Sequence, residues 1–437
     1  MKRVLLLTVS IVMTSFIFSE AIKIDEKMAI EMALENSLSL KKQRLTEKSA
    51  LIDKETSYSA LYPKVSVNSA IVNKNTASTT SVTTPMGTMD VEIPPTNLSL
   101  GFESSLVLTP AIFDGIKLLN INAELEGINS LKKEDEVIRD IKKSFYSLLL
   151  LEEQVKLYQY NYNELEKRYI QSKENYKMGY IDELTLLEVQ VSLENFKPGL
   201  NNLRELYEIS IKNFQNSIGT EENIELIGDI NTKPNSYNDL KIFDLLDKNL
   251  DIKSIDQNIS LLETQISLKK HSSFFPVLGV TYSMSTALND PFERDNWDIN
   301  NYVDDMGSFT LFLSMSLDPL LPNSKERIEI EKLNNSIEIA ELGKKELIQG
   351  LDLALLQQIQ IMENSIELQK SLNDTVKLAN KRLELTKTAY SQGSKELLEV
   401  ESAENELRKA QLELLSEKYN YLAATFDIEY MLSTQGE

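Results

Sequence analysis

The sequence predicts an α+β fold in which one structural unit occurs twice, each copy combining long α-helices with a pair of β-strands. The motif Y-x-x-G ends at Gly179 and again at Gly393, so the two glycines lie slightly less than half the chain length apart. Long stretches carry apolar residues at heptad spacing, which is typical of packed helices. Between these stretches apolar and polar residues alternate with a period of two, which is typical of strands.

Further matches extend the duplication along the chain at almost the same separation. LENSLSLK, from Leu34, resembles LDKNLDIK, from Leu246. LYPKV, around Pro63, resembles FFPVL, around Pro276. Self-similarity at a nearly fixed distance indicates a duplicated unit. We predict a first structural repeat over 22–218, an equatorial or linker segment over 219–240, a second repeat over 241–432 and a C-terminal tail over 433–437.

Residues 1–21 have the pattern of a secretory signal peptide. Lys2 and Arg3 precede an apolar run from Val4 to Phe18, and Ser19 and Ala21 offer small residues for cleavage. The run is shorter than the ~20 apolar residues of a spanning helix, so a membrane anchor is the weaker alternative. We therefore expect export from the cytoplasm and no helical membrane domain.

The composition argues against several classes of function. The sequence contains no cysteine and a single histidine, His271, so it lacks the usual parts of thiolate, zinc and triad chemistry. A formal net charge of −21 disfavours binding to nucleic-acid phosphates. We expect no enzyme activity, no cofactor, no metal and no nucleic-acid partner.

The heptad pattern predicts two long helical hairpins. An uninterrupted helix over Ala111–Lys177 would be roughly 100 Å long at ~1.5 Å per residue. The tip of the first hairpin is expected near Gly179 and that of the second near Gly393. In the first hairpin, Lys197-Pro198-Gly199 predicts an interruption with a kink, because a proline inside a helix removes a hydrogen bond.

Four segments have the length and alternation of membrane-spanning strands, which need ~9–11 residues. Ordinary half-buried strands would show the same pattern and remain an alternative. Four strands cannot close a barrel in lipid, where every backbone N–H and C=O must be paired. Two, three or four chains would reach the ~8 strands of the smallest barrels. The predicted strands are 64–73, 98–108, 277–288 and 309–317.

One loop joins the two strands of each pair. The first, 73–96, is rich in Thr, Ser and Pro. The second, 289–307, is acidic and holds Trp297, the only tryptophan. Its aspartates match no EF-hand spacing, so we interpret it as a solvated surface loop, with calcium binding as the alternative.

Taken together, the signal peptide, the duplicated order of elements and the segment YSQGSKELLEVESAENELRKAQLELLSEKYNYLAATFDIEYML resemble the TolC family of outer-membrane efflux channels. The resemblance implies an α+β membrane channel whose duplicated antiparallel α-helical hairpins form an α-barrel in the periplasm. Four transmembrane β-strands per chain would complete a trimeric β-barrel in the outer membrane. Expected partners are a periplasmic adaptor (membrane fusion protein), an inner-membrane pump of the RND or ABC type and outer-membrane lipid.

The implied function is the exit duct of a tripartite efflux or type I secretion system for drugs, small molecules or proteins. A secreted coiled-coil scaffold or envelope tether without a pore is the alternative that the heptads alone would allow. The resemblance also implies a periplasmic tip that acts as gate and adaptor-docking site. In this tip Glu399 would become a ring of carboxylates under symmetry, although a merely solvated acidic face is the competing interpretation. The predicted tip residues are Gly179, Thr185, Tyr390, Gly393, Lys395, Glu399 and Ser402.

Overall fold

The structure is a computed structural model, and it describes residues 21–93, 95–230, 249–289, 291–292 and 307–432. The predicted signal peptide, acidic loop and C-terminal tail lie wholly or mostly outside these residues. None of the helices in the described ranges is both long enough and apolar enough to cross a membrane.

The chain divides into two compact units. Residues 21–44, 130–230, 249–250 and 348–432 form one, here termed the helical unit. The described residues of 45–129 and 251–347 form the other, here termed the sheet unit.

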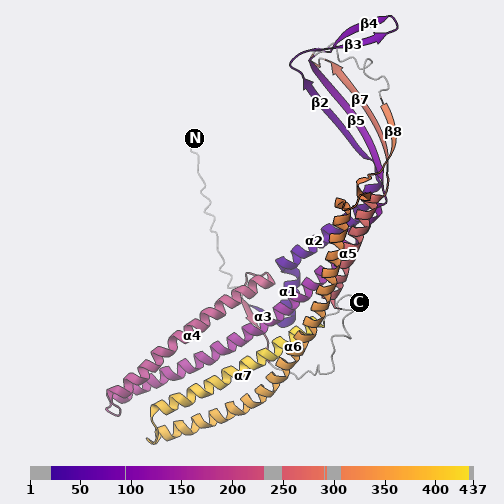
Figure 1. Cartoon of the computed structure of the whole chain (residues 1–437). Coiled ribbons are helices and arrows are strands. Elements are labelled where there is room, and N and C mark those ends of the chain that lie inside the picture. Colours follow the sequence, from indigo (N-terminus) through magenta and orange to yellow (C-terminus); the bar gives the residue numbers. More distant parts are fainter. Residues whose placement is uncertain (1–20, 94, 231–248, 290, 293–306, 433–437) are drawn as a thin grey trace, which may run out of the picture. The chain divides into compact units, whose positions relative to one another are not determined.

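Four long helices make two hairpins, and both hairpin turns lie in the helical unit (Figure 1). The first hairpin consists of α3 (Ala111–Lys177) and α4 (Glu183–Ile218). The second consists of α6 (Lys325–Ser391) and α7 (Leu397–Met431). The 67-residue helix α3 is unbroken over Ala111–Lys177, the span considered from the sequence.

Helix α4 continues through Pro198, so the interruption predicted at Lys197-Pro198-Gly199 is wrong. Side chains on both sides of the proline are well packed. The rings of Phe196 and Tyr158 lie 5.4 Å apart, and Leu200 is 2% exposed. This packing against the neighbouring helix offsets the backbone hydrogen bond that proline cannot donate.

Shorter helices precede the strands of each repeat. They are α1 (Glu26–Asn36), α2 (Leu38–Thr56) and the 3-10 helix η1 (Ser57–Leu61) in the first repeat, and α5 (Leu250–Phe274) in the second. The Asp25 side chain caps α1, accepting a 2.8 Å hydrogen bond from the Met28 N–H. Within the sheet unit, His271 Nδ1 lies 2.5 Å from Asp114 Oδ2, which gives the single histidine a hydrogen-bond partner.

The sheet unit contains a four-stranded antiparallel sheet in the order β2–β5–β7–β8. The two central strands come from different repeats and pair from Asn97 opposite Asn289 to Leu108 opposite Leu278. Among the described residues, each outer strand has a neighbour on one side only. The strands are β2 (Lys64–Asn73), β5 (Thr96–Leu108), β7 (Val277–Asn289) and β8 (Gly307–Ser314).

One face of this sheet is mainly apolar. Residues opposite each other in an antiparallel pair share a face, so Leu106, Val280 and Leu311 form one apolar row across three strands. The Phe309 and Leu313 side chains on this face are each 71% exposed in the single chain. An apolar surface of this kind requires cover by lipid or by protein.

Two strand predictions need correction, and the first concerns the end of β8. The strand expected to reach Leu317 ends at Ser314, because its partner strand begins at Val277, opposite Ser314. Beyond it, Pro319 lies in the 3-10 helix η5 (Asp318–Leu320), which cannot continue a strand.

The second correction concerns the segment predicted as a polar loop over 73–96, which contains a further hairpin. Its strands are β3 (Ser78–Thr84) and β4 (Gly87–Ile93), paired from Ser78 opposite Ile93 to Thr84 opposite Gly87. Serine and threonine dominate β3, so the apolar alternation that reveals a half-buried strand is missing there.

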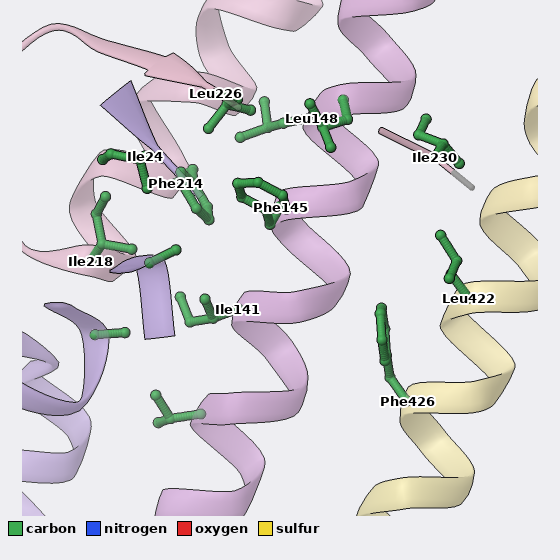
Figure 2. Close-up of a cluster of buried hydrophobic side chains, with 14 of the residues drawn as sticks. Ile24, Ile141, Phe145, Leu148, Phe214, Ile218, Leu226, Ile230, Leu422 and Phe426 are labelled. Carbon is green, nitrogen blue, oxygen red and sulfur yellow. The ribbon is translucent and has the colours of Figure 1, made fainter. Parts of the chain in front are cut away.

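The main hydrophobic core lies in the helical unit (Figure 2). Phe145 on α3 is 1% exposed, and its ring lies 6.2 Å from that of Phe214 on α4. Two three-residue strands, β1 (Ile22–Ile24) and β6 (Ile224–Leu226), pair in parallel and contribute to this core. The described part of the predicted linker segment, 219–230, is therefore packed rather than a free connection.

Candidate functional site: the two hairpin tips

Both hairpin turns have the same backbone geometry. Gly179 has φ 76° and Gly393 has φ 72°, which is the left-handed region that favours glycine. The Tyr180 N–H donates to the Asn175 oxygen at 2.9 Å, and the Ser394 N–H donates to the Ala389 oxygen at 3.0 Å. Each bond lies within one repeat, and the two bonds occupy equivalent positions. Each satisfies a carbonyl at a helix C-terminus.

The helices that follow the turns begin differently. In the first tip, Asp182 caps α4 and accepts hydrogen bonds from the Thr185 N–H at 2.9 Å and from Thr185 Oγ1 at 2.6 Å. Thr185, a predicted tip residue, thus donates both hydrogen bonds to the residue that caps the start of α4. In the second tip, Glu396 occupies the equivalent position of α7 and forms no side-chain cap. Hydrogen bonds from the Thr185 side chain, and then from its backbone, lower the pKa of Asp182.

We expect Asp182→Ala to speed amide hydrogen exchange in the first turn of α4. The carboxylate stabilises that turn through Thr185, so its removal frees the orphan N–H groups. Because the folded-state pKa is lowered, the wild-type contribution is complete above the ordinary aspartate pKa and is lost as pH falls through the lowered value. Glu396→Ala is the matched control, and it should leave exchange at the start of α7 unchanged. Equal effects in both helices would contradict the assignment.

The second tip brings two predicted residues together. Lys395 Nζ lies 2.7 Å from Glu399 Oε2, one helical turn away, and both side chains are about half exposed. Tyr390 is 38% exposed, and Ser402 is exposed. Within a single chain the Glu399 carboxylate is therefore accompanied by a cation. A symmetric ring at this level would contain both charges.

A more buried ionic cluster connects the two hairpins about 11 residues from each glycine turn, or ~16 Å at 1.5 Å per residue. Arg168 Nη2 on α3 donates to Glu404 Oε1 on α7, and their side chains are 18% and 17% exposed. Lys387 Nζ on α6 lies 3.1 Å from the same Glu404 oxygen. One carboxylate thus joins the first hairpin to both helices of the second.

Neighbouring contacts support the same junction. Ser192 Oγ on α4 donates to Glu401 Oε1 on α7 at 2.6 Å. Arg168 Nη1 is buried and has no hydrogen-bond partner among the described residues. A hydrogen bond from Lys167, aided by the charges of Lys387 and Arg168, lowers the pKa of Glu164.

A crevice of about 580 Å³ lies among the same four helices. Its lining includes Phe196 and Arg408, and the Arg408 guanidinium lies 4.8 Å from the centre of the Phe196 ring. Burial lowers the pKa of Arg408. The hairpin junction is thus polar and incompletely filled.

Sequence reasoning missed this junction, although one signal pointed to it. Arg168 and Arg382 are equivalent in the two repeats. Both contact glutamates on α7, namely Glu404 and Glu406. Arginine at a repeated position of helices otherwise rich in lysine favours a fixed ion pair. Which of the many glutamates would be its partner depends on how the hairpins pack.

The fold and the tips together define a class of protein: one with two long helical hairpins and a four-stranded antiparallel sheet. Among the described residues no cluster of three or more His, Asp or Glu side chains is placed to hold a metal ion. Residues 242–432 match the family model for outer membrane efflux proteins. No curated protein has a sequence that matches this chain.

Solved structures share the fold of most of this chain. The CmeC outer membrane channel of Campylobacter jejuni superposes with a TM-score of 0.77 at 14% identity, covering 94% of this chain and 87% of CmeC. The outer membrane protein VceC of Vibrio cholerae gives 0.72 at 13% identity, covering 94% and 97%. A membrane protein from Pseudomonas aeruginosa gives 0.75 at 12% identity, covering 94% and 91%.

The resemblance to the TolC family is thereby confirmed. Residues 242–432 match the outer membrane efflux protein family, and the chain shares its fold with solved outer-membrane channels. The solved structures CusC, CmeC and MtrE, which share this fold, are membrane channels.

Proposed function

We propose that three copies of this chain form an outer-membrane channel that serves as the exit duct of a tripartite efflux or type I secretion system. The observation that carries the proposal is the four-stranded sheet. It has one apolar face, and both of its outer strands, β2 and β8, lack a second neighbour among the described residues.

In lipid an unpaired strand edge is forbidden, because no water is present to satisfy its N–H and C=O groups. Pairing β8 of one copy with β2 of the next would close the sheet. Three copies of four strands give twelve, an even number within the range of outer-membrane barrels. The apolar face would then meet lipid, and the polar face would line the lumen.

The helical hairpins would continue this duct through the periplasm. Their glycine turns, Gly179 and Gly393, would form the entrance, where a periplasmic adaptor and an inner-membrane pump of the RND or ABC type would assemble. Lys395, Glu399, Tyr390 and Ser402 in the second tip, with Thr185 in the first, are the proposed gate and docking residues. The cargo would be drugs, small molecules or proteins.

A conductance experiment tests the channel and its proposed gate. Native mass spectrometry of the detergent-extracted protein should give trimers, and planar bilayers should show discrete cation-selective steps. Glu399→Gln should reduce cation selectivity, because Lys395 then remains without its carboxylate. Lys395→Gln should increase it for the opposite reason.

Asp374→Asn is a matched control, since Asp374 forms an exposed pair with Lys377 on α6, several helical turns before Gly393. It should leave selectivity unchanged. If the conductance steps keep the same selectivity in both tip variants, the channel proposal stands, but Glu399 is not part of its gate. A monomer that conducts in no variant would contradict the channel and support the scaffold alternative.

A further inference from the structure

The polar face of the sheet carries only two charges in the described strands. β2, β5, β7 and β8 contain one lysine, Lys64, and one glutamate, Glu103. The register places both on the face opposite the apolar rows, because Lys64 is paired with Ser105 and Ser66 with Glu103. A charge on the lipid face of a barrel strand is destabilising, so this placement marks the face that meets water.

Each charge stands in a row of small hydroxyl side chains that crosses all four strands. One row contains Glu103, and the other contains Lys64. The first row is Ser66, Glu103, Ser283 and Ser308, and the second is Lys64, Ser105, Thr281 and Thr310. Ser283 Oγ and Ser308 Oγ are hydrogen-bonded at 2.8 Å. Small side chains beside each charge leave it open to solvent.

The two rows are two residues apart along the strands, or ~7 Å at ~3.4 Å per residue. Lys64 and Glu103 are therefore diagonal neighbours on adjacent strands. Neither forms an ion pair or a side-chain hydrogen bond within the described residues. Both side chains are exposed, so each charge is accessible to ions in solution.

We propose that Glu103 and Lys64 form two opposed charged rows that set the ion selectivity of the sheet part of the channel, with Glu103 attracting cations and Lys64 limiting that preference. The inference rests on the proposed trimeric channel and adds a selectivity element separate from the tip. In a trimer the three Glu103 carboxylates would lie at one level of the channel, and the three Lys64 ammonium groups would lie at another. Their influence reaches ~30 Å at 0.01 M salt but only ~3 Å at 1 M, so it should be largest in dilute salt.

The test is the K⁺/Cl⁻ permeability ratio from reversal potentials in a KCl gradient. In dilute salt Glu103→Gln should lower the ratio roughly twofold or more, because fixed charges concentrate their counter-ions. Lys64→Gln should raise it, and the double substitution should return it close to the wild-type value. In ~1 M KCl the differences should vanish. Conducting channels with the same ratio in all variants would overturn the inference and leave the channel proposal intact.

A labelling experiment tests the orientation without relying on current. Because the chain has no cysteine, Glu103→Cys introduces a unique thiol. In proteoliposomes a charged, water-soluble methanethiosulfonate should label this thiol and should spare Phe102→Cys on the apolar face. A negatively charged reagent at position 103 should restore cation preference, and a positively charged one should reverse it. Labelling at 102 but not at 103 would overturn the inference even if no channel conducted.

Discussion

Glu404→Gln is expected to loosen the junction between the two hairpins by about 2–3 kcal/mol, somewhat less than the about 3–5 kcal/mol that removing one partner of a buried ion pair typically costs. Glu404 accepts from Arg168 and pairs with Lys387, so its neutralisation leaves two cations facing each other. The expected loss is lower than the typical one because the Glu404 side chain is still 17% exposed and Gln keeps part of the hydrogen bonding.

The measurement is amide hydrogen exchange in α7 and in the facing part of α3. A loss of ~2 kcal/mol corresponds to roughly thirtyfold less protection, since about 1.36 kcal/mol is a factor of ten. Glu406→Gln is the matched control. Glu406 follows Glu404 closely on the same helix, and its pair with Arg382 is about half exposed. Exposed pairs contribute at most about 1 kcal/mol, so equal effects in the two variants would contradict the buried junction.

Gly219→Ala is expected to destabilise the end of α4 and its contact with α1 by about 2–5 kcal/mol, the combined cost of a strained backbone and a steric overlap. Gly219 ends α4 with φ 72°, a conformation that costs L-residues roughly 1–2 kcal/mol. In addition, a Cβ at this position would overlap the Cβ of Asn36, and crowding of this kind costs typically about 1–3 kcal/mol. Asn36 Nδ2 also donates to the Ile218 oxygen at 3.4 Å, so the overlap falls on a formed contact.

Gly179→Ala separates the two causes. Gly179 has nearly the same φ, 76°, but no atom lies within 4 Å of the position of a Cβ. This control should show only the conformational part, roughly 1–2 kcal/mol. Hydrogen exchange over 26–36 and 210–218 measures the Gly219→Ala effect, and exchange around 175–185 measures the control. Adding Asn36→Gly to Gly219→Ala should restore part of the protection. If it restores none, the overlap is not the cause.

The repeat, the helices and the tips were predictable because they depend on local pattern. Heptad spacing over Val137–Tyr176 marks the apolar face of that part of α3, and glycine favours the positive φ that each hairpin turn needs. Alternation likewise located the four strands of the main sheet. It did not reveal β3 and β4, because β3 is mostly serine and threonine and shows no apolar period.

Contacts between distant segments could not be predicted in the same way. Glu404 is one of many glutamates in α7, and nothing local distinguishes it as the partner of Arg168. The parallel pairing of β1 with β6 joins Ile22 to Ile224 through strands of three residues, which are too short to show a period. Lys395 and Glu399 lie within reach by their i,i+4 spacing, yet the sequence alone led us to treat them as separate parts of the tip.

By itself, then, the sequence determined the duplicated architecture, the long helices, the two glycine turns and the strand pairs, because each follows from residue type and spacing along the chain. Only the tertiary structure decided that Glu404 joins the hairpins, that Thr185 serves a helix start and that Glu103 and Lys64 share the polar face. These contacts depend on side-chain direction, or on register and packing between segments that are distant in the chain. The position of a residue in the chain does not determine any of these by itself.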